Sequence, residues 1–234
     1  MIASGKGGTG KSTLAVHLGG RLAALGRRVL LVELDSGLRS VDLIAGACGK
    51  TVYDLEDIFC GRCEADKAVV ESPAFPGLFL ISAPYSGGEI RPERLRRLTG
   101  RMADSFDLIL LDTAAGLGDA FLSACAAADR ALVVVQPDPV TCRDGRIVAD
   151  SLFDAGIAEV RLILNRVAGV NPIRDLDECI DTVGAQLIGV VPESAALAAA
   201  AAAGRPLDGR ESAAAAISNI ARRLTGEQVP LAIR

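Results

Sequence analysis

Residues 4–13 read SGKGGTGKST, and this stretch decides how the rest of the chain is interpreted. It contains the pattern G-x-x-x-x-G-K-[ST], in which glycines let successive backbone N–H groups curl around an anion. The lysine adds a positive charge, the hydroxyl can ligate Mg²⁺, and the positive end of the following helix faces the phosphates. The pattern therefore predicts a site for the phosphates of a nucleotide and for Mg²⁺. The residues expected to bind them are Gly5, Lys6, Gly7, Gly8, Thr9, Gly10, Lys11, Ser12 and Thr13, with Lys11 also catalytic and Ser12 on the metal.

The composition limits the class of protein. Half of the 234 residues are hydrophobic and only 3% are aromatic, which suits a core of Ala, Val, Leu and Ile between parallel strands and helices. The net charge of −4 argues against a protein dominated by nucleic-acid affinity, so we expect no nucleic-acid partner. Six cysteines without a secretory leader, and no apolar run of roughly 18–20 residues, predict a reduced, cytoplasmic protein.

Short runs of Val, Leu and Ile recur along the chain, each followed by a turn and an amphipathic segment. They are apolar on both faces, as buried strands of a parallel sheet are. This pattern predicts an α/β fold: a three-layer, doubly wound, mostly parallel sheet flanked by helices, in one P-loop ATPase domain spanning 1–234. The expected strands are 28–34, 78–82, 106–111, 131–136, 160–165 and 186–191.

The helices are predicted from apolar spacing and from capping residues. Leu14, Leu18, Leu22 and Leu25 are spaced to share one buried face of the helix that follows the loop. A later helix contains the alanine run 198–203, for which Ser194 is the expected N-cap and Gly204 the first residue past the end. We expect the tail from about residue 226 to be irregular.

A metal-bound phosphate also needs a carboxylate at the end of a neighbouring strand. The segment FDLILLDTAAG, residues 106–116, supplies Asp112 after a run of apolar residues. We therefore expect Asp112 to hold Mg²⁺ through its hydration water.

The additional lysine in GKGGTGKS, Lys6, makes this loop resemble the deviant Walker A motif of the MinD/ParA family of P-loop ATPases. The resemblance implies a slow, Mg-dependent ATP hydrolase that forms a homodimer with ATP. Lys6 would then be catalytic, because it would reach the nucleotide of the partner subunit and stabilise charge on the γ-phosphate. The alternative is a lysine that is only a solvated loop charge.

Within that family the chain looks most similar to the MinD branch of septum-site-determining ATPases. The segment 30–43, LLVELDSGLRSVDL, and the later Tyr53 and Asp54 carry this resemblance. It implies that Asp35 lies in switch I and orients the attacking water. Two departures leave roles open, because Glu33 replaces the first aspartate of a D-x-D pair and Ala114 replaces the proline of switch II. The matching residues of segment 30–54 are Asp35, Gly37, Leu38, Arg39, Asp42, Leu43, Tyr53 and Asp54.

The second half of the chain continues the resemblance. It implies that Asn165 contacts adenine and that Pro192 and Glu193 close over the base. The segment QPDPVTCRDGRI resembles the region that binds the membrane-bound and activator partners, so Arg143 and Asp144 are expected at a site for division-site regulator proteins.

Two alternative functions remain open at this stage. A ParA-like partitioning ATPase would use a basic helix face to hold DNA, although a solvated face is the favoured interpretation of this cluster. A metallocentre or iron–sulfur assembly ATPase would use Cys60 and Cys63, and a four-thiolate site would then need two chains. The lone histidine, His17, is expected to be a packing or surface residue. The basic cluster consists of Arg91, Arg94, Arg97 and Arg101.

The two ends of the chain raise separate expectations. The tail breaks at Gly226 and Pro230 and leaves too little apolar face for interfacial binding, so we expect no ATP-dependent binding to liposomes; peripheral contact with the inner face of the cell membrane stays open. At the other end only Met1, Ile2 and Ala3 precede the loop, and a charged α-amino group is costly to bury. We therefore expect either a start further upstream or a short strand whose terminus reaches water.

Overall fold

Strand β1 (Ile2–Ala3) lies at the centre of an eight-stranded sheet and delivers the chain directly into the loop. The computed structural model describes residues 1–37, 39–85, 87–168 and 172–231, and within 172–175 only the backbone. The sheet has the order β3-β4-β2-β5-β1-β6-β7-β8, and every pair is parallel except β3 with β4. The other strands are β2 (Val29–Glu33), β3 (Val70–Glu71), β4 (Leu78–Ile81), β5 (Leu108–Asp112), β6 (Arg130–Val135), β7 (Glu159–Val167) and β8 (Gln186–Pro192).

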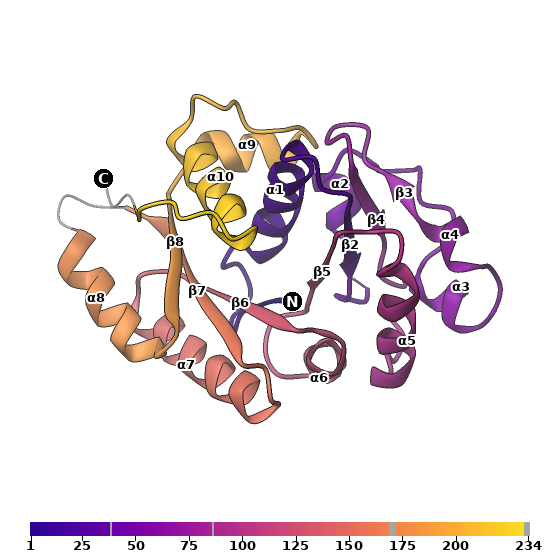
Figure 1. Cartoon of the computed structure of the whole chain (residues 1–234), viewed down its shortest axis with the longest axis horizontal. Helices are drawn as coiled ribbons and strands as arrows, with labels where there is room; N and C mark the ends of the chain where they lie inside the picture. Colours follow the sequence, from indigo (N-terminus) through magenta and orange to yellow (C-terminus); the bar gives the residue numbers. More distant parts are fainter. Residues whose placement is uncertain (38, 86, 169–171, 232–234) are drawn as a thin grey trace.

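Helices cover both faces of the sheet and give the predicted three layers (Figure 1). One apolar cluster packs the first face beneath α1 (Lys11–Ala24), α2 (Val41–Ile44), α9 (Ala195–Ala202) and α10 (Ser212–Leu224). The second cluster lies against the opposite face. Its helices are α3 (Leu55–Phe59), α4 (Ala65–Ala68), α5 (Pro92–Met102), α6 (Asp119–Ala127), α7 (Pro139–Asp154) and α8 (Pro172–Val183). In the described residues no helix is both long enough and apolar enough to cross a bilayer.

The structure confirms the predicted strands, with ends shifted by one or two residues. The shift matters at Asp112, which is the last residue of β5 and not the first residue after it. Sequence reasoning missed β3, a two-residue edge strand too short to show a pattern.

The predicted helix contacts hold with one exception. Leu14, Leu18 and Leu22 are buried, but Leu25 is 43% exposed because α1 ends one residue earlier, at Ala24. Ser194 caps α9 as predicted, since its side chain accepts a hydrogen bond from the Leu197 N–H.

Two basic groups, the His17 imidazole and the Met1 α-amino group, are buried, and burial lowers the pKa of each. His17 packs its ring edge-on against Phe75, and burial lowers its pKa to about 4. The Met1 α-amino group also lies inside the protein, where it donates to the Arg130 carbonyl at 2.7 Å, so the expectation of a terminus in water is not met. Burial lowers the pKa of this amino group to about 6, which favours its neutral form.

Candidate active site

The loop between β1 and α1 lies at the carboxyl edge of the parallel sheet, where open α/β sheets bind ligands. Helix α1 begins at Lys11, and Gly10 precedes it with a φ of 89°, in the left-handed region that favours glycine. A Cβ at position 10 would also lie 2.4 Å from Nδ2 of Asn165. Gly10 is therefore required by both its conformation and its surroundings, and it points the first N–H groups of α1 toward the space above the loop.

Neighbouring strands hold the loop in place. The Asn165 side chain, from β7, donates from Nδ2 to the Thr9 carbonyl at 2.7 Å. The Gln136 side chain, which follows β6, donates from Nε2 to the Gly8 carbonyl at 3.3 Å. The Gly116 N–H donates to the Ser4 carbonyl at 2.9 Å and ties the loop to the segment after β5. These contacts fix the loop before any ligand binds, which lowers the entropic cost of binding.

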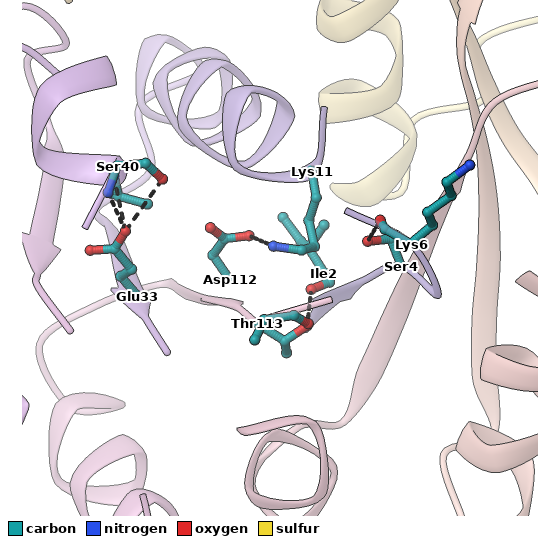
Figure 2. A network of polar contacts seen from close by, with 10 residues as sticks. Ile2, Ser4, Lys6, Lys11, Glu33, Ser40, Asp112 and Thr113 are labelled. Carbon is teal, nitrogen blue, oxygen red and sulfur yellow. Dashed lines mark hydrogen bonds and ion pairs between the residues drawn. The ribbon is translucent and has the colours of Figure 1, made fainter. Parts of the chain in front are cut away.

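Lys11 and Asp112 form a buried ion pair beneath the loop (Figure 2). The Lys11 Nζ lies 2.9 Å from Oδ1 of Asp112, and the two side chains are 7% and 0% exposed. Oδ2 of Asp112 is buried and has no hydrogen-bond partner among the described residues. Buried carboxylate oxygens are normally satisfied, so this free oxygen fits the predicted role of receiving a metal-bound water.

Glu33 is the last residue of β2 and Asp35 lies two residues past it, and their carboxyl groups have different surroundings. Asp35 is half-buried past the strand, where burial raises the pKa of its carboxyl group, Lys11 lowers it and Asp112 raises it. Glu33 is fully buried, and its Oε1 accepts from the N–H groups of Ser40, at 2.7 Å, and Val41, at 3.0 Å (Figure 2). The role that the sequence left open for Glu33 is thus visible, because this carboxyl group holds the segment after Asp35 and the start of α2.

Lys6 is exposed, and its side chain points away from Lys11 and Asp112 (Figure 2). The charge of Lys6 acts instead on Asp138, at the start of α7. There the pKa of Asp138 is lowered, chiefly by the hydrogen bond from the Thr141 hydroxyl and in smaller part by Lys6. Within this chain Lys6 therefore lies outside the cluster of charged groups below the loop.

The residues that are predicted to contact the adenine base lie on the other side of the loop, at the ends of β7 and β8. Asn165 is 3% exposed, and its Nδ2 is occupied by the Thr9 carbonyl while its Oδ1 has no described partner. Pro192 ends β8, and the N–H of the exposed Glu193 donates to the Val167 carbonyl at 3.0 Å. The structure gives Asn165 a loop-supporting contact that was not predicted. The adenine contacts of Asn165, Pro192 and Glu193 remain predictions.

Arg143 and Asp144, predicted to bind regulators, lie early in α7. Arg143 is exposed, whereas Asp144 packs against the loop, since a Cβ at Gly5 would lie 2.6 Å from Cβ of Asp144. The loop contacts of Asp144, Gln136 and Ser4 were not predicted. The only signal for Gln136 was its place directly after an apolar strand, on the edge where the loop lies.

The comparisons with known proteins agree with this geometry. The family described as the CobQ/CobB/MinD/ParA nucleotide binding domain matches residues 1–207. The chain belongs to the MinD/ParA family of ATPases. It is 34% identical to the septum site-determining protein MinD of Bacillus subtilis over an alignment of 243 residues that covers 100% of this chain and 91% of that protein. The MinD of Synechocystis is 34% identical over 239 residues, covering 98% and 90% of the two chains.

Solved structures of MinD proteins have the same fold. The chain is similar to MinD in a MinC:MinD cell division protein complex of Aquifex aeolicus, with 35% identity, a TM-score of 0.91 and coverage of 99% of this chain and 97% of that one. MinD of Pyrococcus horikoshii complexed with Mg-ADP gives 26% identity, a TM-score of 0.85 and coverage of 95% and 93%. These matches confirm the predicted P-loop fold and the MinD/ParA family.

The residues that would serve the two alternative functions show no metal-binding arrangement and no set of unpaired arginines among the described residues. Cys60 is exposed and Cys63 half-buried, and the described residues contain no group of three or more His, Cys, Asp or Glu side chains placed to hold a metal. Three exposed arginines of the basic cluster have partners within the chain: Arg91 pairs with Glu89, Arg101 pairs with Glu64, and Arg94 donates to a backbone carbonyl. Leu38, one of the positions that suggested the MinD branch, lies outside the described residues.

Proposed function

We propose that this chain is a MinD-like ATPase that closes into a homodimer when it binds Mg-ATP and opens when it hydrolyses the nucleotide slowly. The proposed role is placement of the division site, as the names of its MinD relatives indicate. The observation that carries the proposal is the position of Lys6. This lysine is exposed, directed away from the charged groups beneath its own loop, and held on a loop that other strands fix.

The residues divide the chemistry between them. Lys11 can leave Asp112 to contact a bound phosphate, and the N–H groups at the start of α1 add further donors. Ser12 and, through water, Asp112 would hold magnesium, which when bound neutralises charge on the phosphates. Asp35, whose pKa is raised by burial, accepts a hydrogen bond from the attacking water and orients it.

Lys6 would complete the site of a second subunit. Charge develops on the γ-phosphate oxygens during phosphoryl transfer, and a cation delivered across an interface stabilises it by about 10³–10⁵ in rate. The exposed side of α7 next to Lys6, with Arg143 between Val140 and Ile147, is the proposed site for division-site regulators. Val140 and Ile147 are 57% and 49% exposed and lie on the same side of the helix by their spacing.

The proposal is tested by Lys6→Ala, with Lys67→Ala in α4 as a matched surface control. Lys6→Ala should bind ATP as tightly as wild type when monomeric, yet lose hydrolysis by about 10³-fold or more. ATP-dependent dimerisation, measured by size exclusion with light scattering, should also weaken. Hydrolysis at the wild-type rate in Lys6→Ala would show that Lys6 does not act in the partner subunit.

The alternatives are separated by one further experiment. Asp35→Ala, which should block hydrolysis, is run with ATP on size exclusion alone, with acidic lipid vesicles and with duplex DNA. The proposal expects an ATP-dependent dimer. Salt-sensitive retention of DNA would favour the ParA-like function. Metal analysis of anaerobically purified protein tests the function in metallocentre assembly.

A further inference from the structure

Arg166 has an unusual backbone conformation next to the loop. Among the described residues it is the one non-glycine residue with a positive φ, 56°. It lies where β7 bulges against β8, since the register shifts between Asn165 and Val167. A left-handed backbone is costly for a residue with a side chain, and such residues are concentrated at functional sites where the surroundings enforce them.

The side chain of Arg166 lies beside the phosphate loop. Its Nε is 4.0 Å from the place where a Cβ would stand on Gly10, the residue directly before α1. The side chain is nevertheless exposed, and no hydrogen bond or ion pair joins the guanidinium to another described residue. A planar cation is therefore present at the rim of the loop, and it makes no polar contact with the other described residues.

The arrangement of charges shows which part of a nucleotide this cation would meet. Lys11, Asp112 and Asp35 lie toward β2 and β5, on one side of β1, and mark the end where terminal phosphates and metal bind. Arg166 belongs to β7, beyond β6 on the other side of β1. A nucleotide whose phosphates follow the loop would extend its ribose and base toward β7 and β8.

We propose that Arg166 contacts the adenine base, with its guanidinium plane stacked on the ring. This inference rests on the proposed function, because it assumes that ATP binds. Arginine suits the task since its planar, delocalised cation stacks on aromatic faces and is weakly hydrated. The positive φ fits this role, because it occurs at the residue whose guanidinium group lies beside Gly10, on the side of the loop toward which the base would extend.

The experiment measures binding of ATP, ADP and inorganic tripolyphosphate by calorimetry to wild type, Arg166→Ala, Arg166→Lys and Arg166→Gly. Arg161→Ala, at the amino end of the same strand, is the matched control. Loss of stacking should weaken ATP and ADP equally, by about tenfold, and leave tripolyphosphate unchanged. Lysine keeps the charge and loses the plane, so Arg166→Lys should behave like Arg166→Ala.

Arg166→Gly separates a contact from a structural role. Glycine adopts a φ of 56° freely, so this variant without nucleotide should melt at the wild-type temperature or about 1–3 °C above it, while binding ATP as weakly as Arg166→Ala. Wild-type affinity in Arg166→Ala, an equal loss for tripolyphosphate, or a lower melting temperature in Arg166→Gly would each overturn the inference alone. Failure of wild type to bind ATP would overturn the proposed function as well.

Discussion

The two sides of the phosphate loop are built from different chemistry. Toward β2 and β5 the loop meets Lys11, Asp112, Glu33 and Asp35, of which the first three are buried. Toward β7 and β8 it meets the neutral amide of Asn165, which supports the Thr9 carbonyl, and the exposed Arg166. One side is held by an ion pair and the other by a neutral hydrogen bond.

The difference follows from what each side has to do. Buried charges are tolerated only when they are paired, and each half of the Lys11–Asp112 pair offsets the desolvation of the other. If a nucleotide binds, Lys11 can pair with a phosphate and Asp112 with the hydrated metal, so neither charge is left without a partner. A neutral amide carries no such cost, so it can hold the loop permanently. The side with the ion pair is therefore suited to chemistry, and the Asn165 amide on the other side is suited to support of the loop.

The largest effect is expected from breaking the ion pair. Lys11→Ala should abolish ATP binding, and the free energy of unfolding should fall by about 3–5 kcal/mol because Asp112 stays buried without a counter-ion. The double variant Lys11→Ala/Asp112→Asn should regain most of the stability and none of the binding. Urea unfolding and calorimetry measure both quantities. A double variant as unstable as the single one would contradict the role assigned to charge compensation.

Asp35→Asn should affect activity and stability in opposite directions. Hydrolysis should fall by about 10²–10⁴-fold with ATP still bound, as measured by phosphate release. Burial raises the pKa of Asp35, so its contribution to stability is present below the unfolded-state value of about 4 and is lost as pH rises through the higher folded-state value. Asp35→Asn should therefore be more stable than wild type at neutral pH.

Unfolding measured over a range of pH tests whether burial of the Asp35 charge causes this difference in stability. The difference in unfolding free energy between Asp35→Asn and wild type should shrink as the pH falls toward about 4. Asp104→Asn, in an exposed turn, is the control for the same substitution at the surface. A variant less stable than wild type at neutral pH would mean that Asp35 is held by a favourable contact.

The smallest effect is expected at Asn165, on the β7 side of the loop. Asn165→Ala removes the donor to the Thr9 carbonyl and should lower the free energy of unfolding by about 1 kcal/mol, together with a modest loss of ATP affinity. Asn165→Asp should be worse at neutral pH, because a buried carboxylate would face that carbonyl. Gln186→Ala, exposed at the start of β8, is the control in urea unfolding. Equal stability of Asn165→Ala and wild type would show that the loop does not need this support.

Much of this site could be predicted from local sequence, because the loop pattern, the following helix and the apolar run before Asp112 each lie within a few residues. Contacts between distant segments could not. Nothing in the sequence shows that Glu33 reaches Ser40 and Val41 and not the metal site, or that Asn165 turns its amide toward Thr9. The conformation of Arg166 depends on a register shift between β7 and β8, which only the assembled sheet reveals.

The close packing of Gly5 against Asp144 has a mechanical consequence. With Cβ of Asp144 in the space that a side chain at position 5 would need, the first turns of α7 cannot shift without moving the backbone next to Lys6. The outer side of that helix carries Val140, Arg143 and Ile147. A protein that binds this outer side would therefore contact the helix that packs directly against Gly5, the residue before Lys6.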